Sequence, residues 1–325
     1  MRIRRLAVTL AVAVATALLP FVSADAAPGN PVSMTDGFYA DPDLQAAVWV
    51  RSHSGDARAA RIRTAVAAVP QGKWFGEWSG DVRSAVSAYV TAADRANKLP
   101  ILVPYFMYGR DCGSHSAGGA SSPDAYKRWI TDFAAGIQDK PAVVVLEPDA
   151  LAQRLDCVPS GQRAVRLELL RFAVDALRSA PNAWTYLDAG NASWVSPDTM
   201  AGELHAAGAQ KIRGFALNVS NYHTTAESKS YADKVNAKLK ARFGYTKPFV
   251  VDSSRNGNGP APGNEWCNPA GRKIGAATRV GGVNGVEMQL WVKNPGESDG
   301  ACGIAPTTPA GQFSPDLTMR LIEGR

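Results

Sequence analysis

The feature that most constrains the fold is an alternation of short apolar runs with longer amphipathic segments. The runs show no regular alternation of polar and apolar residues, as expected for parallel strands that are covered on both faces. We predict strands at Ile101–Tyr105, Ala142–Leu146, Trp184–Leu187, Gly214–Leu217, Phe249–Val251 and Val286–Val292. We predict helices at Asp81–Asn97, Ala125–Gln138, Gly161–Leu177 and Ala226–Phe243. Ser121 or Ser122 is the candidate cap of the second helix. This order predicts an α/β fold, and a single β/α barrel is favoured over two doubly wound domains.

Residues 1–27 have the pattern of an export signal. A basic start at Met1–Arg5 precedes an apolar run at Leu6–Val22, and Ala24-Asp25-Ala26 fits a small-x-small cleavage site. A membrane anchor is the alternative, but a run of about 17 residues is short for a bilayer and Pro20 interrupts it. We therefore expect a secreted, extracellular protein with residues 28–325 as a single domain and no membrane segment after cleavage.

The cysteine count agrees with export. The chain has four cysteines, and an even number in an exported protein predicts two disulfides. Of the three possible pairings, we expect Cys112–Cys157 and Cys267–Cys302, which close the shortest loops. A zinc site is the alternative, but the sequence has no C-x-x-C, H-x-x-H or H-E-x-x-H pattern. We predict no metal and no cofactor.

The charge pattern argues against nucleic acid as a partner. The formal net charge is +6, and the basic residues are dispersed without a Lys/Arg block. A serine hydrolase is also disfavoured. Gly296–Gly300 matches G-x-S-x-G, but Pro295 precedes it and no histidine follows it.

Polar residues recur at or after the ends of the predicted strands. In strand order they are Asp111, Asp149, Asp188, Asn218 and Asp252, followed by the group Lys293, Glu297 and Asp299. Carboxylates can simply cap helices at such positions. Their recurrence instead favours one shared site, because barrel enzymes place active sites at the carboxyl ends of their strands.

Abundant acids without cofactor motifs favour carboxylate chemistry, of which glycoside hydrolysis is the main example. Asp149 follows the apolar run Ala142–Leu146, where desolvation would raise the pKa of an acid. Asp111 is a suitable second carboxylate, because Cys112 and Cys157 could join the two loops. Sugars also need aromatic platforms. Trp74, Trp194 and Trp266 lie in polar contexts typical of loops, whereas Trp129 and Trp291 have the pattern of core residues.

Four long motifs in order carry a resemblance to a known family. They are Val103-Pro104-Tyr105 through Gly113, Leu146-Glu147-Pro148-Asp149, Asp252 through Gly259 with Asn264-Glu265-Trp266-Cys267, and Lys293 through Gly300. With these motifs the chain resembles glycoside hydrolase family 6, which contains cellulases of endoglucanase and cellobiohydrolase type. The resemblance covers nearly all of the mature chain.

The resemblance implies a distorted, seven-stranded parallel β/α barrel that hydrolyses β-1,4-glucan with inversion. By motif, Asp149 is the general acid, and Asp111 raises its pKa and assists the attacking water. Tyr105 matches the tyrosine that distorts the sugar at the cleavage point. Asp299 matches the residue proposed as base, a role disputed in the family. The cysteine pairs of the family coincide with the pairing given above.

The resemblance also implies a set of substrate contacts. The matching positions are Ser116 for water in the Gly113–Gly119 loop, Trp74, Trp266, Lys293 and Glu297 on the non-reducing side, Trp194 and Asn218 on the leaving side, and Asp188. The family often has histidine where this chain has Asn191, which bears on leaving-side binding.

Loop lengths favour attack at internal bonds. The segment between Cys302 and Gly311 is short, which predicts an open cleft. No linker or cellulose-binding module follows the domain in this sequence, so soluble or amorphous glucan is the expected substrate. We expect a monomeric endo-β-1,4-glucanase. The alternatives are a cellobiohydrolase-type or other β-glucan hydrolase and a non-catalytic glucan-binding protein.

Overall fold

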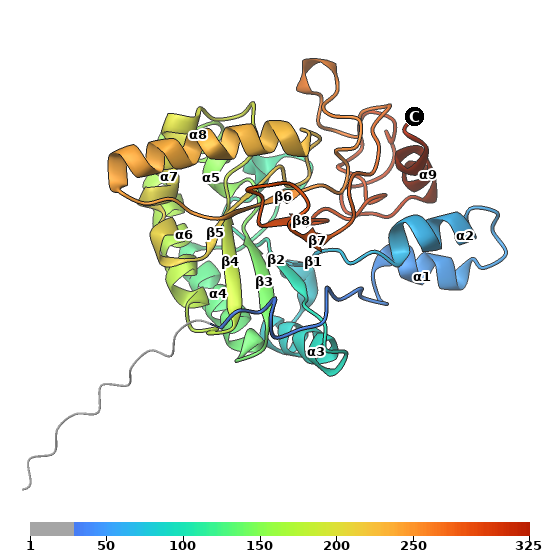
Figure 1. Cartoon of the computed structure of the whole chain (residues 1–325), viewed down its shortest axis with the longest axis horizontal. Coiled ribbons are helices and arrows are strands. Elements are labelled where there is room, and N and C mark those ends of the chain that lie inside the picture. The colour runs from blue at the N-terminus through green and yellow to red at the C-terminus, as the bar shows by residue number, and fades with distance from the viewer. Residues whose placement is uncertain (1–28) are drawn as a thin grey trace, which may run out of the picture.

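The computed structural model describes residues 29–325 (Figure 1). The expected signal at 1–27 lies outside the described residues. Within 29–325, no helix combines the length and the apolar character needed to cross a membrane.

A curled sheet forms the centre of the fold. Its strands are β1 (Lys73–Phe75), β2 (Ile101–Pro104), β3 (Ala142–Leu146), β4 (Ala183–Asp188), β5 (Gly214–Leu217), β6 (Phe249–Asp252), β7 (Arg279–Val280) and β8 (Met288–Leu290). They are ordered β1-β2-β3-β4-β5-β6-β8-β7, and only β7 pairs in the antiparallel direction. All six predicted strands are present, and the sheet matches the expected distorted barrel with one short antiparallel strand added at its edge.

A narrow seam closes the curl between β1 and the end of β8. The backbone N–H of Gly72 donates to the Trp291 carbonyl, and Trp74 Nε1 donates to the Val292 carbonyl, both at 2.8 Å. A Cβ on Gly72 would lie 2.7 Å from the Val292 oxygen. Glycine is therefore required at position 72 for the two ends of the sheet to approach this closely.

Helices cover the outside of the sheet. They are α1 (Gln45–Ser52), α2 (Ala59–Ile62), α3 (Val82–Arg95), α4 (Pro123–Ile137), α5 (Ala150–Gln153), α6 (Arg163–Leu177), α7 (Pro197–Ala206), α8 (Thr225–Phe243) and α9 (Pro315–Glu323). In Figure 1, α3, α4, α6, α7 and α8 flank the sheet, whereas α1, α2 and α9 gather at one side. The four predicted helices are confirmed, and the Ser122 hydroxyl caps α4 by accepting from the Ala125 N–H at 3.1 Å.

The strands are buried on both faces, as predicted. On β3, Val143 and Val145 pack into the barrel interior, whereas Val144 and Leu146 pack against the helices. The predicted core position of Trp291 is confirmed, because the residue is 1% exposed beneath α1 and η1 (Arg63–Ala67). Trp129 is half-buried against the helix-side cluster.

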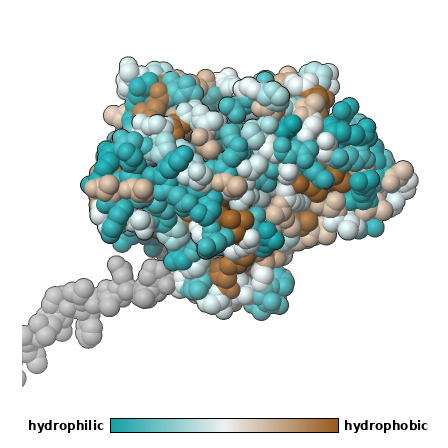
Figure 2. All heavy atoms as spheres, turned by 45° about the horizontal axis from the view of Figure 1, so that its top comes forward, coloured by the Kyte–Doolittle hydropathy of each residue, from teal (hydrophilic) through white to brown (hydrophobic). Residues whose placement is uncertain are grey.

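The face in Figure 2 is largely hydrophilic or neutral, and strongly hydrophobic residues form only small, separate patches. Among the described residues, the exposed large hydrophobic side chains are Met34, Val48, Trp78, Phe172, Trp266 and Val280.

Candidate active site

Strained backbone marks the carboxyl ends of the strands. Non-glycine residues with positive φ include Asp111 (55°), Glu147 (46°), Asp149 (69°), Asn218 (67°) and Ser220 (58°). Such conformations are costly for residues with a side chain and often cluster at functional sites. Three strands, β2, β3 and β5, are therefore each followed by a strained loop at the same end of the barrel.

Asp149 lies two residues after Glu147, at the start of α5. Its backbone N–H donates to Asp188 Oδ1 at 2.9 Å, which fixes the left-handed turn. Burial, together with the negative charge of Asp111, raises the pKa of Asp149 to about 7. The Lys293 charge opposes this rise. Asp149 is thus a carboxyl group that keeps its proton in mildly acidic water, as a general acid requires.

Asp111 is held by contacts to its own loop and to α5. Its Oδ2 accepts from the Ser116 N–H at 2.8 Å, and its Oδ1 accepts from Gln153 Nε2 at 3.0 Å. The Cys112–Cys157 disulfide joins this loop to the segment after α5. Since Asp149 begins α5, the two carboxylates belong to one tethered unit, as the sequence predicted. The Cys267–Cys302 disulfide is also confirmed.

Tyr105 and Trp74 form an aromatic corner beside this unit. The rings meet edge to face, with centroids 5.1 Å apart. The Arg110 guanidinium lies over the Tyr105 ring at 4.6 Å and is paired with Glu77 at 2.7 Å. Burial and the nearby Asp149 and Asp111 charges keep the pKa of the Tyr105 phenol well above its usual value. The expectation of a loop at Trp74 is wrong: the residue lies in β1, a strand too short to show a periodic pattern.

Glu147 is a buried carboxyl group that the sequence analysis did not assign to the site. Its carboxylate accepts from the backbone N–H groups of Phe106 and Met107 at 3.1–3.2 Å. Burial raises its pKa to about 7 despite those hydrogen bonds. Glu147 therefore fixes the chain directly after Tyr105.

Asp188 and Asn218 are buried rather than open to a ligand. Asp188 Oδ1 accepts from Asp149 and from the Gly190 N–H at 3.0 Å, and burial followed by the Asp149 charge raises its pKa well above the usual value. The Asn218 amide group donates to the Asp252 carbonyl at 2.8 Å and accepts from the His223 N–H at 3.0 Å. Both residues position backbone loops in this structure.

Asp252 joins three of these loops. Its Oδ2 accepts from the N–H groups of Ser220 at 3.1 Å and Lys293 at 2.9 Å, and its Oδ1 accepts from the Ser254 N–H at 2.9 Å. Burial raises its pKa above the usual value. The ends of β5, β6 and β8 are therefore held together through one carboxylate.

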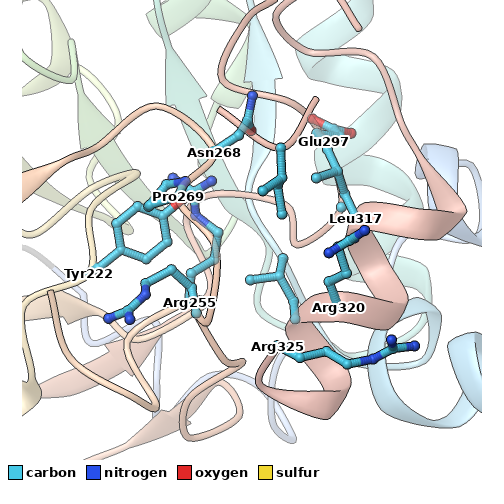
Figure 3. A pocket seen from close by; sticks show the side chains of 12 residues that line it. Tyr222, Arg255, Asn268, Pro269, Glu297, Leu317, Arg320 and Arg325 are labelled. Atoms are coloured by element: carbon cyan, nitrogen blue, oxygen red, sulfur yellow. The ribbon is translucent and has the colours of Figure 1, made fainter. Parts of the chain in front are cut away.

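A small cavity of about 20 Å³ lies between the loops after β5 and β6 and helix α9. Tyr222, Arg255, Leu317 and Arg320 are among its lining residues (Figure 3). This volume holds about one or two water molecules. It is too small for a sugar ring and is not the substrate site.

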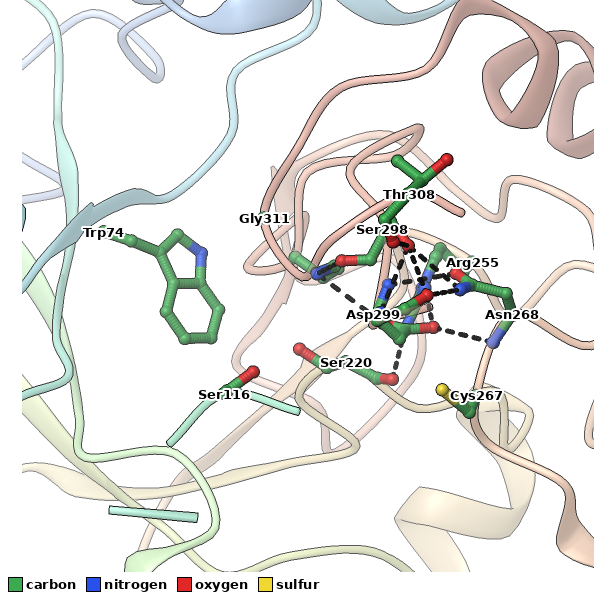
Figure 4. Close-up of polar contacts among 12 residues, drawn as sticks. Trp74, Ser116, Ser220, Arg255, Cys267, Asn268, Ser298, Asp299, Thr308 and Gly311 are labelled. Carbon is green, nitrogen blue, oxygen red and sulfur yellow. Dashed lines mark hydrogen bonds and ion pairs between the residues drawn. The ribbon is translucent and has the colours of Figure 1, made fainter. Parts of the chain in front are cut away.

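Asp299 lies in a cationic cluster beside this cavity (Figure 4). Its Oδ2 accepts from Arg255 Nη1 at 2.8 Å, the Asn268 N–H at 3.1 Å and the Tyr222 hydroxyl at 3.2 Å. Lys293 Nζ lies 3.5 Å from its Oδ1. Burial alone would raise the pKa of Asp299, but the Arg255 and Lys293 charges hold it below the usual value.

The remaining predicted substrate contacts differ in their surroundings. Figure 4 draws Trp74 and Ser116 in the same view as the Asp299 cluster, each apart from it. Glu297 accepts from Gln45 Nε2 at 2.9 Å, and burial raises its pKa to about 7 against the Lys293 charge. Trp194 is half-buried and donates from Nε1 to Asp156 at 3.1 Å.

One side chain connects the loop after β2 with the loops around β8. His115 meets the exposed Trp266 edge-on, with ring centroids 6.0 Å apart. A Cβ on Gly300 would lie 2.5 Å from the His115 ring. His115 also lies near the sulfurs of Cys267 and Cys302, which are bonded to each other rather than free to bind a metal.

The chain belongs to Glycosyl hydrolases family 6, whose profile matches residues 33–325. It is 53% identical to Endoglucanase 1 of Streptomyces halstedii over 94% of this chain and 95% of the relative. It is 42% identical to Endoglucanase A of Thermobispora bispora over 98% of this chain and 69% of that protein.

Solved structures agree with this membership. The endoglucanase Cel6 of Mycobacterium tuberculosis, in complex with methyl-cellobiosyl-4-deoxy-4-thio-β-D-cellobioside, has a TM-score of 0.83 and 38% identity. The similarity covers 91% of this chain and 99% of that structure.

Proposed function

We propose that this protein is a secreted, monomeric endo-β-1,4-glucanase that inverts the configuration at the anomeric carbon. The observation that carries the proposal is the tethered pair of Asp149 and Asp111, in which one carboxyl group holds its proton beside a second carboxylate. An acid and a separate acceptor for the proton of water are what inversion requires.

The reaction starts with proton transfer from Asp149 to the glycosidic oxygen as the bond to the anomeric carbon breaks. A water molecule attacks that carbon from the opposite face and becomes the new hydroxyl group, and its proton passes toward Asp111. Ser116 lies beside this path, because its N–H already binds Asp111. Tyr105 and Trp74 hold the distorted ring through apolar contact.

Asp299 contributes charge rather than base catalysis in this proposal. Its pKa is low, and Oδ2 already accepts three hydrogen bonds. A base with a low pKa takes a proton poorly. We therefore assign the proton of water to Asp111, while Asp299 fixes Lys293 and Arg255 near the substrate.

The endo assignment is supported by the relatives and by the loops. Four relatives that are 42–53% identical are named endoglucanases, whereas a Podospora anserina relative named a cellobiohydrolase is 29% identical. The short segment 302–311 folds back through hydrogen bonds to Ser298. The proposed binding site is completed by Trp266, Lys293, Glu297 and Trp194. Asp188 contributes by positioning Asp149.

Residues 28–325 form one domain in this proposal. The family match over residues 33–325 and the continuous sheet support it. The two disulfides support export.

The test follows viscosity and reducing ends together during hydrolysis of carboxymethyl cellulose. A rapid fall in viscosity with few new ends is expected for endo attack. Proton NMR of the products from cellohexaose should show the α-anomer first. Release of cellobiose without a fall in viscosity would favour a cellobiohydrolase. Binding without cleavage of any β-glucan would favour a binding protein.

A further inference from the structure

Trp78 is an exposed aromatic side chain for which neither the fold nor the proposed mechanism provides a use. It is 57% exposed, more than any other exposed large hydrophobic side chain among residues 29–325. It lies in η2 (Glu77–Ser79), a single turn that begins two residues after β1 ends. Its backbone is therefore at the same end of the barrel as the carboxylates.

The Trp78 ring is held by a hydrogen bond from its indole nitrogen and by close contact with the Gly76 backbone. Its Nε1 donates to the Trp74 carbonyl at 3.3 Å. A Cβ on Gly76 would lie 2.6 Å from the ring atoms, so the indole lies directly across a backbone without a side chain. The Arg110 guanidinium lies 5.3 Å from the ring centroid. An indole held in this way is already ordered, and binding costs it little conformational entropy.

Arg110 connects this ring to the aromatic corner. The same guanidinium lies over Tyr105 at 4.6 Å and is itself buried. Tyr105 and Trp78 therefore share one cation, and Trp74 joins them through its edge-to-face contact with Tyr105 and its carbonyl bond from Trp78. Of the three side chains, Trp78 is the most exposed to solvent.

We propose that Trp78 is an additional sugar platform, which binds a glucosyl unit beyond the one at Trp74. The apolar C–H face of a pyranose stacks on an indole ring, and a fixed, exposed ring bonded to the aromatic corner suits that contact. This inference rests on the proposed glucanase function. It makes Trp78 a residue that selects longer chains and leaves the chemical step unchanged.

The test compares Trp78→Ala with the wild type on cello-oligosaccharides from cellotriose to cellohexaose. We expect KM for cellohexaose to rise about threefold to tenfold with kcat unchanged, because one stacking contact is lost. KM for cellotriose should not change. Trp78→Phe keeps a flat ring and should recover most of the binding. Phe172→Ala, which removes another exposed aromatic from α6, is the matched control.

Three outcomes would overturn the inference. They are unchanged KM at every chain length, an equal rise for cellotriose and cellohexaose, and an equal loss of kcat at all lengths. The last would show that Trp78 only supports Arg110 and the loop of Asp111. If Trp78→Ala does not fold, Trp78→Leu covers Arg110 without a flat face and is tested in the same way. A wild type that cleaves none of these sugars would instead refute the proposed function.

Discussion

The two ends of the carboxylate site are built on opposite electrostatic principles. At the end of β3, Asp149 is half-buried near the Asp111 charge, its N–H is bound to Asp188, and its pKa rises to about 7. At the end of β8, Asp299 is buried more completely but is bound to Arg255, and its pKa falls. Burial is common to both, so the partner decides which carboxyl group holds a proton. The first region can supply a proton, and the second supplies a fixed negative charge.

The largest expected effect comes from removing the proton donor. Asp149→Asn should lower the rate on unactivated glucan by about 10²- to 10⁴-fold, because general acid catalysis contributes about that much. The rate is measured as reducing ends from carboxymethyl cellulose, and cellohexaose binding should be retained. Asp132→Asn, an exposed carboxylate on α4, is the control. Near-normal turnover in Asp149→Asn would refute its assignment as the acid.

Breaking the charged pair at the other end should cost stability. Arg255→Met leaves Asp299 buried without its main partner, and we expect a loss of about 3–5 kcal/mol in the free energy of unfolding. Urea unfolding measures this loss. The double variant Arg255→Met/Asp299→Leu should recover part of it, because neither member of the Arg255–Asp299 pair is then buried without the other. If both variants are equally unstable, the ion pair does not explain the effect.

The disulfides sharpen the comparison, because each lies in one region. Either Cys112→Ser/Cys157→Ser or Cys267→Ser/Cys302→Ser should lower stability by about 2–4 kcal/mol. Only the first pair holds the loop of Asp111 to α5. It should therefore also reduce kcat in conditions where both variants are folded. Equal kcat in the two variants would contradict a role for that tether in catalysis.

The smallest effect concerns pH. Asp149 must be protonated to act, so kcat/KM should fall as pH rises through about 7. The Asp111 charge helps to raise that pKa, and Asp111→Asn should shift the alkaline limb of the remaining activity to lower pH. The contribution of Asp149 to the free energy of unfolding also decreases as pH rises. Between about pH 4 and about pH 7 the folded protein keeps a proton that the unfolded chain releases, so the free energy of unfolding falls as pH rises. If the alkaline limb of the pH profile does not move in Asp111→Asn, the Asp111 charge does not raise the pKa of Asp149.

The main strands and the positions of the two proposed catalytic carboxylates were predictable for local reasons. A strand such as Ala142–Leu146 is buried on both faces, so its apolar run is visible without any knowledge of its neighbours. Asp149 and Asp111 follow such strands within recognisable motifs. By contrast, β1 and β7 have three and two residues and carry no periodic signal.

The partners of the carboxylates were less predictable, because they come from distant parts of the chain. Arg255 and Asn268 reach Asp299 across separations of 44 and 31 residues. Asn218 was expected to contact substrate, yet its amide group is turned into the protein and fully engaged. A motif identifies such a residue but does not show which way its side chain points.

Trp74 has two structural roles, one in the seam between β1 and β8 and one in the aromatic corner. Its indole N–H is one of the two hydrogen bonds described across that seam, and its ring forms part of the aromatic corner. A sugar ring stacked on this indole would contact the same side chain whose N–H bonds to the Val292 carbonyl and closes the barrel. If Trp74 binds sugar as proposed, a substitution at this position changes both the sugar contact and a hydrogen bond that closes the barrel.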